Sequence, residues 1–387
     1  MDPSRFIAGK LKFEGKLTAG AIAVSYLVII IAVAVSSGFR HTVREGITDF
    51  AGDAVITTVR PSYLSGDESI PGKLSVEDRI LSISGVEELI PSALRAGVVK
   101  CGDQIHGVMF RGDPAFKDST LRVTIPSALA NLTGLGPGDA MVSYFVGEKV
   151  KVRKWTVSEV TDDPVAFDGN LVVNCSLDDL RRVSGWGLDR CGSFRVRFSS
   201  GYKTPSAMSD ICARISAALM ESEDPDEQAL MAVSSRQLYP QVYDWLDLLD
   251  VNVLFILALM TIVAGFNMVS GLLIMLLRNI SVIGTLKTLG MTDRAVGKVF
   301  VLSASRSVLW GMLVGNALAL CFCVIQGTTH LIKLNPVNYF VSFVPVRVDI
   351  LRILSADIIS GLVIIAILLL PTLLISGVDP ARTVRMQ

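Results

Sequence analysis

The residue types that most often carry out catalysis are sparse in this sequence and do not form catalytic motifs. The three histidines, His41, His106 and His330, lie far apart, and none belongs to an H-E-x-x-H zinc motif. The chain also lacks a G-x-S-x-G nucleophile elbow and a G-x-x-x-x-G-K-[ST] phosphate loop. We therefore expect no enzyme activity and no cofactor in this chain, and any energy for work must come from a partner.

The cysteines do not indicate a metal site. Four of them fall between residues 38 and 250, and two lie close together near residue 322; they are Cys101, Cys175, Cys191, Cys212, Cys321 and Cys323. No C-x-x-C pair occurs, and soft-ligand metal sites usually contain closely spaced pairs. Buried free thiols are the favoured interpretation, although an oxidising compartment would permit up to two disulfides.

The composition is that of a membrane protein. The 387 residues have a mean hydropathy of +0.52, and 36 basic residues balance 36 acidic ones. A chain without surplus positive charge is a poor candidate for nucleic-acid binding. Its apolar residues gather in blocks that, as helices, can cross a hydrocarbon core of about 30 Å. These four predicted transmembrane helices are residues 17–37, 251–277, 299–324 and 353–375.

Two features of these blocks allow a second interpretation. The first block resembles a signal peptide with a cleavage site at Ala32-Val33-Ala34, but it is longer than the usual apolar region of about 7 to 15 residues. Arg306 and Asp357 could mark a functional polar site within the bilayer. Because both lie near block ends, we favour side chains that reach the interface.

Lysine and arginine near the helix ends predict the orientation. They are concentrated in residues 1–16, in the 278–298 loop and in the 376–387 tail. The positive-inside rule places these three segments, and hence both termini, in the cytoplasm. Residues 38–250 and the 325–352 loop are then outside.

Residues 38–250 are long enough for a folded domain of mixed α and β structure. Strands with period-2 alternation are predicted at 53–59 and 194–198, and a helix is predicted at 206–220. Ser75 and Ser176 have the sequence context of capping boxes that begin two further helices.

We expect this domain to have two α+β lobes. A membrane-proximal lobe would comprise 38–114 and 199–250, and a middle lobe would comprise 115–198. Within the middle lobe, Met141 to Val157 reads as a hairpin that turns at Gly147-Glu148.

The 278–298 loop is the most informative stretch. Ile280, Ile283, Leu286 and Leu289 recur at near-helical spacing, and Gly290 is placed to cap the helix. Such a helix could lie on the lipid surface or dock in a groove of a soluble partner, and periodicity does not choose between them.

The stretch from Ile283 to Thr292, IGTLKTLGMT, resembles the coupling segment of ABC transporter permeases of the MacB and FtsX superfamily. Four other stretches are similar to this superfamily. They are Phe6–Leu11 before the first helix, Ser37–Ile47 after it, Leu334–Val346 before the fourth helix, and the C-terminal Asp379–Arg385. The loop that ends at Val344-Pro345-Val346 is most similar to the lipoprotein-releasing branch, also called Lol-type.

The resemblance implies four transmembrane helices with a large periplasmic α+β domain between helices one and two, in a Gram-negative bacterial inner membrane. It implies a second permease subunit, of the same or a different chain, and a cytoplasmic ATPase dimer that binds ATP and magnesium. The cargo implied is a triacylated lipoprotein. The residues that would contact the ATPase are Ile283, Leu286, Lys287, Leu289, Gly290 and Met291.

Outer-half residues of helices one and two are the candidate lipoprotein site. Our hypothesis assigns this role to Val35, Val251, Leu254, Phe255 and Ala258. The alternative is ordinary lipid-facing or helix-packing surface, since helices of this kind are apolar on all sides.

Two departures from the superfamily pattern leave alternatives open. Ser281-Val282 stands where an acidic residue often precedes the coupling segment, and the stretch Tyr144 to Trp155 is short and lacks the proline of the hook that recruits a periplasmic lipoprotein chaperone. Whether this subunit binds a chaperone therefore stays open. The rival functions are an FtsX-like transmitter that activates a periplasmic hydrolase and a MacB-like efflux component.

Overall fold

The computed structural model describes residues 16–59, 68–101, 104–116, 120–147, 149–161, 171–335, 339 and 341–372. Three predicted features lie outside these residues: the segment before the first helix, the C-terminal Asp379–Arg385 motif and the cytoplasmic tail. The chain forms two compact units. The helical unit comprises the described parts of Met1–His41, Trp245–Lys333 and Val344–Gln387, and the sheet unit comprises those of Thr42–Asp244 and Leu334–Phe343.

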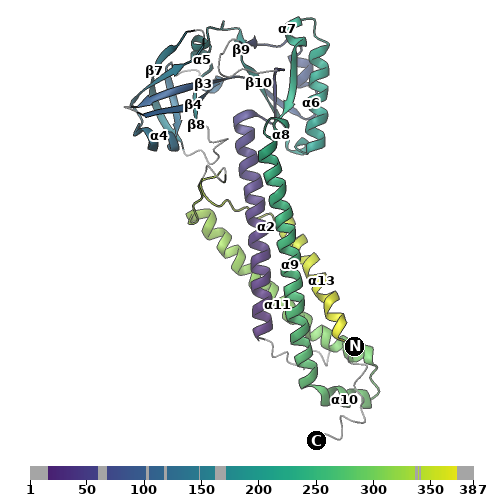
Figure 1. Ribbon diagram of the computed structural model, residues 1–387. Helices are drawn as coiled ribbons and strands as arrows, with labels where there is room; N and C mark the ends of the chain where they lie inside the picture. Colours follow the sequence, from purple (N-terminus) through teal and green to yellow (C-terminus); the bar gives the residue numbers. More distant parts are fainter. Residues whose placement is uncertain are drawn as a thin grey trace. The chain divides into compact units, whose positions relative to one another are not determined.

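Long apolar helices make up the helical unit (Figure 1). Its helices are α2 (Lys16–Ala51), α9 (Pro240–Arg278), α10 (Ile280–Thr288), α11 (Asp293–Thr329) and α13 (Ile350–Thr372), of which α2 and α9 continue into the sheet unit. Within the described chain, all of these except the short α10 are long and apolar enough to cross a membrane. α2, α9 and α11 each contain one of the apolar blocks, and α13 contains residues 353–372 of the fourth. α2 continues well beyond its block, to Ala51.

Small residues allow these helices to approach closely. Gly311 and Gly315 of α11 leave no room for a side chain, because a Cβ there would meet Ile22 and the main chain of Ala23 on α2. Close approach of this kind is how helices associate in a lipid environment, where apolar burial alone gives little driving force. The core beside these glycines contains Tyr26, Met268, Phe300 and Ile364 from the four long helices.

The two charged residues of the apolar blocks differ in their surroundings. Arg306 is exposed on α11. Asp357 is buried, with 7% of its surface exposed, and its carboxylate accepts a hydrogen bond from the side-chain amide of Asn316 at 2.6 Å. The expectation that Asp357 reaches the interface was wrong, because the α11 partner holds the side chain inside the helix bundle.

Strands and short helices between α2 and α9 in the chain form the sheet unit. The strands are β1 (Ala54–Thr58), β2 (Ile70–Pro71), β3 (Val86–Cys101), β4 (Gln104–Asp113), β5 (Arg122–Pro126), β6 (Ala140–Phe145), β7 (Lys151–Thr161), β8 (Leu171–Ser176), β9 (Arg190–Cys191), β10 (Ser193–Phe198) and β11 (Leu230–Ser234). The helices are α3 (Glu77–Leu81), α4 (Ser127–Thr133), α5 (Leu177–Ser184), α6 (Pro205–Met220), α7 (Pro225–Gln228) and α8 (Ser235–Leu238), with short 3-10 turns at Pro114–Phe116 and Ser200–Tyr202. The described strands give a nine-stranded sheet in the order β11-β1-β10-β3-β4-β8-β5-β7-β6, and β2 pairs with β9.

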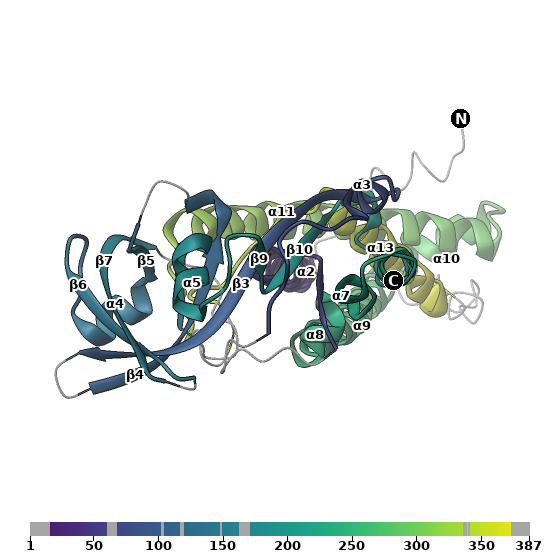
Figure 2. The same ribbon diagram turned by 90° about the horizontal axis from the view of Figure 1, so that it is seen from above.

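One long strand, β3, joins two cores (Figure 2). Its first half pairs with β10, beside a core that contains Ile56 and Phe198. Its second half pairs with β4 and also with β6, so that β3, β4, β8, β5, β7 and β6 form a closed ring of pairings. The core of this ring contains Phe110 and Trp155, whose rings stack with centroids 5.6 Å apart.

Most of the elements predicted from periodicity are present. The strands expected at 53–59 and 194–198 are β1 and β10, the helix expected at 206–220 is α6, and β6 and β7 pair as a hairpin with Met141 opposite Trp155. The core of the ring begins at Ala93, upstream of residue 115 where the middle lobe was expected, because β3 runs through both cores.

The two predicted capping boxes were wrong. Val76, not Ser75, occupies the N-cap of α3, and the Ser75 hydroxyl donates to the carboxylate of Glu227. Ser176 occupies the N-cap of α5 but makes no capping hydrogen bond, and the Asp179 carboxylate accepts from the main-chain N–H of Leu121 at 2.7 Å. In both cases a group distant in the sequence takes the place of the local partner.

Candidate functional site

The predicted coupling segment folds as α10 and ends in a defined cap. Gly290 follows the helix with a φ of +88°, and its N–H donates to the carbonyl oxygen of Lys287 at 3.0 Å. The N–H of Met291 donates to the carbonyl oxygen of Leu286 at 3.0 Å. These two bonds are those of a Schellman motif, which requires a left-handed residue where glycine is favoured.

The six predicted coupling residues divide into a buried set and an exposed set. Ile283 is 1% exposed and shares a core with Val296 and Phe300 of α11, while Leu286 and Met291 pack partly against the same core. Leu289, in contrast, is 77% exposed. The expected apolar face therefore packs within the chain at its centre and is open to partners at its C-terminal end.

An ion pair also fixes α10 to α11. The Lys287 ammonium lies 2.8 Å from the carboxylate of Asp293 in the first turn of α11, and the lysine side chain is only 9% exposed. An acidic group in the first turn of a helix is favourable beside the unpaired N–H groups there. The ion pair therefore adds to the apolar contacts that hold α10 against the first turns of α11.

The predicted lipoprotein-site residues of α9 lie on one face. Val251, Leu254, Phe255 and Ala258 follow i, i+3, i+4, i+7 spacing, and all four are exposed, Phe255 by 70%. Val35 of α2 is half-buried. In their most apolar windows α9 has only 17% of its residues buried, against 44% for α2, so α9 offers the larger free apolar surface.

Polar contacts tie α2 to α9 just beyond this face. The carboxylate of Asp250 accepts from the Ser36 hydroxyl at 3.0 Å and forms an ion pair with Arg40. The rings of Phe39 and Trp245 meet edge to face with centroids 5.7 Å apart. The sequence interpretation missed this cluster; its only signal was a run of acidic residues at one end of the second apolar block.

The loop before α13 also packs against α2. The N–H of Arg347 donates to the carbonyl oxygen of Ala34 at 3.0 Å, and the guanidinium of Arg352 donates to the Ser37 hydroxyl at 3.3 Å. Gly38 makes this contact possible, because a Cβ there would clash with the main chain of Pro345. The Val344-Pro345-Val346 motif therefore rests on α2.

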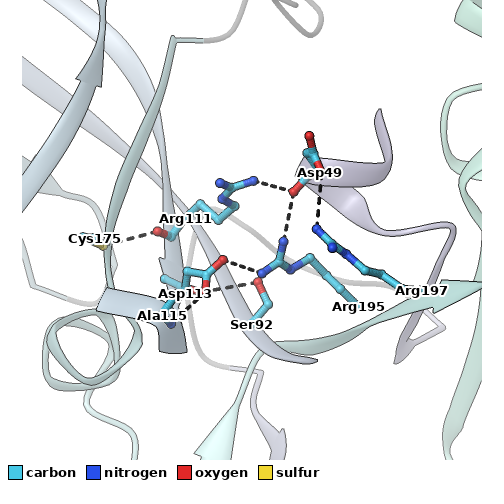
Figure 3. Close-up of polar contacts among 9 residues, drawn as sticks. Asp49, Ser92, Arg111, Asp113, Ala115, Cys175, Arg195 and Arg197 are labelled. Carbon is cyan, nitrogen blue, oxygen red and sulfur yellow. Dashed lines mark hydrogen bonds and ion pairs between the residues drawn. The ribbon is translucent and has the colours of Figure 1, made fainter. Parts of the chain in front are cut away.

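In the sheet unit, three arginines converge on the C-terminal end of α2 (Figure 3). We call Arg111, Arg195 and Arg197 the arginine clamp. The guanidinium groups of Arg111 and Arg195 donate to the carbonyl oxygen of Asp49 at 2.8 and 2.9 Å, and that of Arg197 donates to the Asp49 carboxylate at 3.3 Å.

The arginine clamp satisfies groups that a helix end leaves open. The last carbonyl oxygens of a helix have no partner within the helix and carry its negative partial charge, so cationic donors stabilise them. Arg195 is 5% exposed, and its second amino group donates to the Asp113 carboxylate at 2.5 Å. The end of α2 is thus fixed to strands β4 and β10. The alternation of arginines at 195 and 197 was visible in the sequence, but it indicated only a strand of a half-buried sheet.

No ligand cluster for a metal is found in the described part of the chain. All six cysteines are free, and three in the sheet unit are buried. Burial raises the pKa of Cys191 to about 12 and that of Cys212 to about 11. Thiols held in their protonated form are poor nucleophiles, so these cysteines contribute to packing and not to chemistry.

Comparison with known proteins adds independent information. Residues 254–380 match the family of FtsX-like permease C-terminal domains. The chain is 23% identical over 425 residues to the lipoprotein-releasing system transmembrane protein LolC of Neisseria meningitidis serogroup B (strain ATCC BAA-335 / MC58), with 98% of this chain and 95% of that protein covered.

Similar solved structures correspond to part of the chain. The periplasmic region of MacB from Actinobacillus actinomycetemcomitans is 11% identical, with a TM-score of 0.31 over 51% of this chain and 95% of that one. The extracellular domain of the noncanonic ABC-type transporter YknZ from Gram-positive bacteria is 12% identical, with a TM-score of 0.29 over 46% of this chain and 98% of that one. The permease-family match over residues 254–380 and the similarity to LolC along nearly the whole chain support the resemblance to Lol-type permeases of the MacB/FtsX superfamily that the sequence motifs predicted.

Proposed function

We propose that this chain is the permease subunit of an ABC transporter that extracts triacylated lipoproteins from the outer leaflet of a bacterial inner membrane. The observation that carries the proposal is the similarity to a lipoprotein-releasing protein over 98% of the chain. ATP and magnesium are bound by a separate cytoplasmic ATPase dimer, and a second permease subunit completes the membrane part. Both termini lie in the cytoplasm, and the sheet unit lies in the periplasm.

The strength of lipid anchoring explains why extraction of the proposed substrate needs ATP. Each buried CH2 group of an acyl chain contributes about 0.8 kcal/mol to membrane anchoring, so three chains hold a lipoprotein in the bilayer almost irreversibly. Extraction requires an apolar surface that accepts the chains as they leave the lipid. The exposed face of α9, formed by Val251, Leu254, Phe255 and Ala258 and joined by Val35 of α2, has that character.

The coupling residues take two roles in this proposal. Leu289 and Gly290, which are exposed, contact the ATPase. Ile283, Leu286, Lys287 and Met291 hold α10 against α11 and so pass its movement into the membrane helices. Within the sheet unit, the arginine clamp holds the C-terminal end of α2 against strands β4 and β10.

A second candidate function rests on the match of residues 254–380 to FtsX-like permeases. In that case the chain moves no substrate, and its helix movements activate a cell-wall hydrolase in the periplasm. Purification of the tagged protein from its own membranes in mild detergent, followed by mass spectrometry, separates the two functions. Recovery of an ATPase with triacylated lipoproteins supports release, whereas an ATPase with a peptidoglycan hydrolase and no lipoprotein supports the transmitter.

Photocrosslinking tests the proposed site on α9. A photoreactive residue at Phe255 should capture lipoprotein during turnover. The matched control is Leu362 of α13, which is exposed to a similar degree at 63% and should capture none. Capture of only the second permease from Phe255 would remove this face from the substrate path.

A further inference from the structure

A buried acid, Asp357, and a half-buried amide, Asn316, face each other between α11 and α13. The side-chain amide of Asn316 donates to Oδ2 of Asp357 at 2.6 Å. The other carboxylate oxygen of Asp357 and the amide oxygen of Asn316 are both buried, and neither has a hydrogen-bond partner among the described residues. Two acceptor oxygens, one on α11 and one on α13, therefore remain without donors between helices that can cross a membrane.

Among the described residues, no positive charge faces this pair. The Tyr26 hydroxyl of α2 is the titratable group that faces Asp357, and it contacts the Ser360 hydroxyl at 3.2 Å. On the α11 side, Gly315 packs against the main chain of Ala23. Within the described residues no lysine or arginine pairs with Asp357. An ionised carboxylate here would have one oxygen without either a donor or a counter-charge, which is costly in an apolar medium.

We propose that Asp357 is a proton-binding site and that its carboxylic acid forms a two-bond pair with the Asn316 amide. A proton from water binds Oδ1 of Asp357, and the resulting O–H donates to Oδ1 of Asn316. The amide N–H continues to donate to Oδ2, so an eight-membered hydrogen-bonded ring results. One proton thereby satisfies both open acceptors. The terminal torsions of Asp and Asn are broad, so a small rotation brings the two planes together.

The acid–amide pair gives α11 and α13 a neutral, directional contact inside the membrane. Interhelical hydrogen bonds of this type hold helices together where apolar burial does not. The inference does not depend on which substrate the protein carries, because it concerns contacts within one chain.

Infrared spectroscopy of the full-length protein in lipid nanodiscs tests the proposal. Exposed carboxyl groups are ionised at neutral pH, so a carboxylic acid C=O band at neutral pH reports a protonated buried acid. The band should be present in the wild-type protein and absent in Asp357→Asn, whose amide has the same shape. The control Asp349→Asn, at a half-buried position directly before α13 whose side chain is 39% exposed, should keep the band. A difference spectrum between wild type and Asp357→Asn without an acid band would overturn the proposal, since Asp357 would then be ionised.

A second variant keeps the test valid if Asp357→Asn does not fold. Asn316→Leu removes the partner and should keep the acid band but move it to higher frequency, because the acid loses its hydrogen bonds. An unchanged band would contradict the paired geometry. The pH dependence provides a further check: the folded state holds a proton that the unfolded chain releases at neutral pH, so wild-type stability should fall relative to Asp357→Asn as the pH rises. If stability changed with pH in the same way for the wild type and Asp357→Asn, this result would also contradict the bound proton.

Discussion

The main-chain carbonyl oxygen of Asp49 accepts a hydrogen bond from the Arg195 guanidinium at 2.9 Å, near the end of the long apolar helix α2. The same guanidinium donates to the Asp113 carboxylate at 2.5 Å on β4. One buried side chain therefore connects the helix end to two strands of the sheet. Any movement of this part of α2 has to displace β10 and β4 or break a buried ion pair.

Replacement of Arg195 should be strongly destabilising. Arg195→Met leaves the Asp113 side chain, which is only 14% exposed, without its partner, and loss of one member of a largely buried ion pair costs up to about 3 kcal/mol. We expect a clearly lower midpoint of thermal unfolding for the sheet unit, measured on the full-length protein in detergent. Combination with Asp113→Asn should recover part of the loss.

Arg197→Met is the matched control on the same strand. Arg197 and its partner Asp49 are 43% and 73% exposed, and exposed ion pairs contribute about 0 to 1 kcal/mol. Equal losses from the two variants would mean that the buried position of Arg195 has no special role.

A single methyl group at Gly38 should displace the loop on α2. In Gly38→Ala the new Cβ would overlap the main chain of Pro345, and overpacking of this type costs about 1 to 3 kcal/mol. We expect faster hydrogen exchange at the N–H of Arg347, which donates to Ala34. Gly20→Ala on the same helix has open space around it and should leave this exchange unchanged.

Substitution of Gly290, the cap of α10, by alanine should be more harmful than substitution by asparagine. At Gly290 the φ of +88° strains an alanine by about 1 kcal/mol, whereas asparagine tolerates the left-handed region better. Gly290→Ala should therefore speed hydrogen exchange at the N–H of Met291 and reduce ATP-driven activity of the purified complex. Gly290→Asn should stay close to wild type, and equal behaviour of the two variants would exclude a role for the cap.

The stability of the sheet unit should depend on pH through Glu227. Burial acts to raise the pKa of this carboxyl, but hydrogen bonds from the Ser222 hydroxyl and from the hydroxyl and N–H of Ser75 outweigh it and lower the pKa. Because the folded-state pKa lies below the unfolded value of about 4.3, this contribution is complete above that pH and disappears as the pH falls through the folded value.

Thermal unfolding between about pH 6 and about pH 3 tests this dependence. The wild-type midpoint should fall more steeply than that of Glu227→Gln, while the exposed Glu223→Gln should follow the wild type. Wild-type and Glu227→Gln curves of equal slope would show that Glu227 titrates alike in the folded and unfolded states.

Periodicity predicted the local elements well, because it reports which face of each element meets a core. Val196 and Phe198 alternate with Arg195 and Arg197, and this pattern correctly gave β10. Gly290 was correctly placed as the cap of α10, since a left-handed cap depends on a few neighbouring residues. The four apolar blocks likewise correspond to α2, α9, α11 and α13.

Contacts between distant segments could not be predicted in this way. The burial of Arg195 depends on the end of α2, some 146 positions away, and that of Asp357 depends on Asn316 of another helix. Ser75 has the local context of a cap, yet Glu227 provides a stronger partner from far along the chain. The sequence did not show what covers the middle of the α10 apolar face. In the structure, Ile283 packs there against other residues of the same chain.

The most direct test of the proposed function is the location of lipoproteins after depletion of this protein. Cells with the gene under a repressible promoter are labelled with radioactive palmitate, and inner and outer membranes are separated after depletion. Lipoprotein release predicts that labelled outer-membrane lipoproteins accumulate in the inner membrane, and that wild-type protein, but not a variant altered at Leu289 and Gly290, restores their transfer. Normal lipoprotein distribution after full depletion, with or without a defect in cell-wall hydrolysis, would contradict the proposed function.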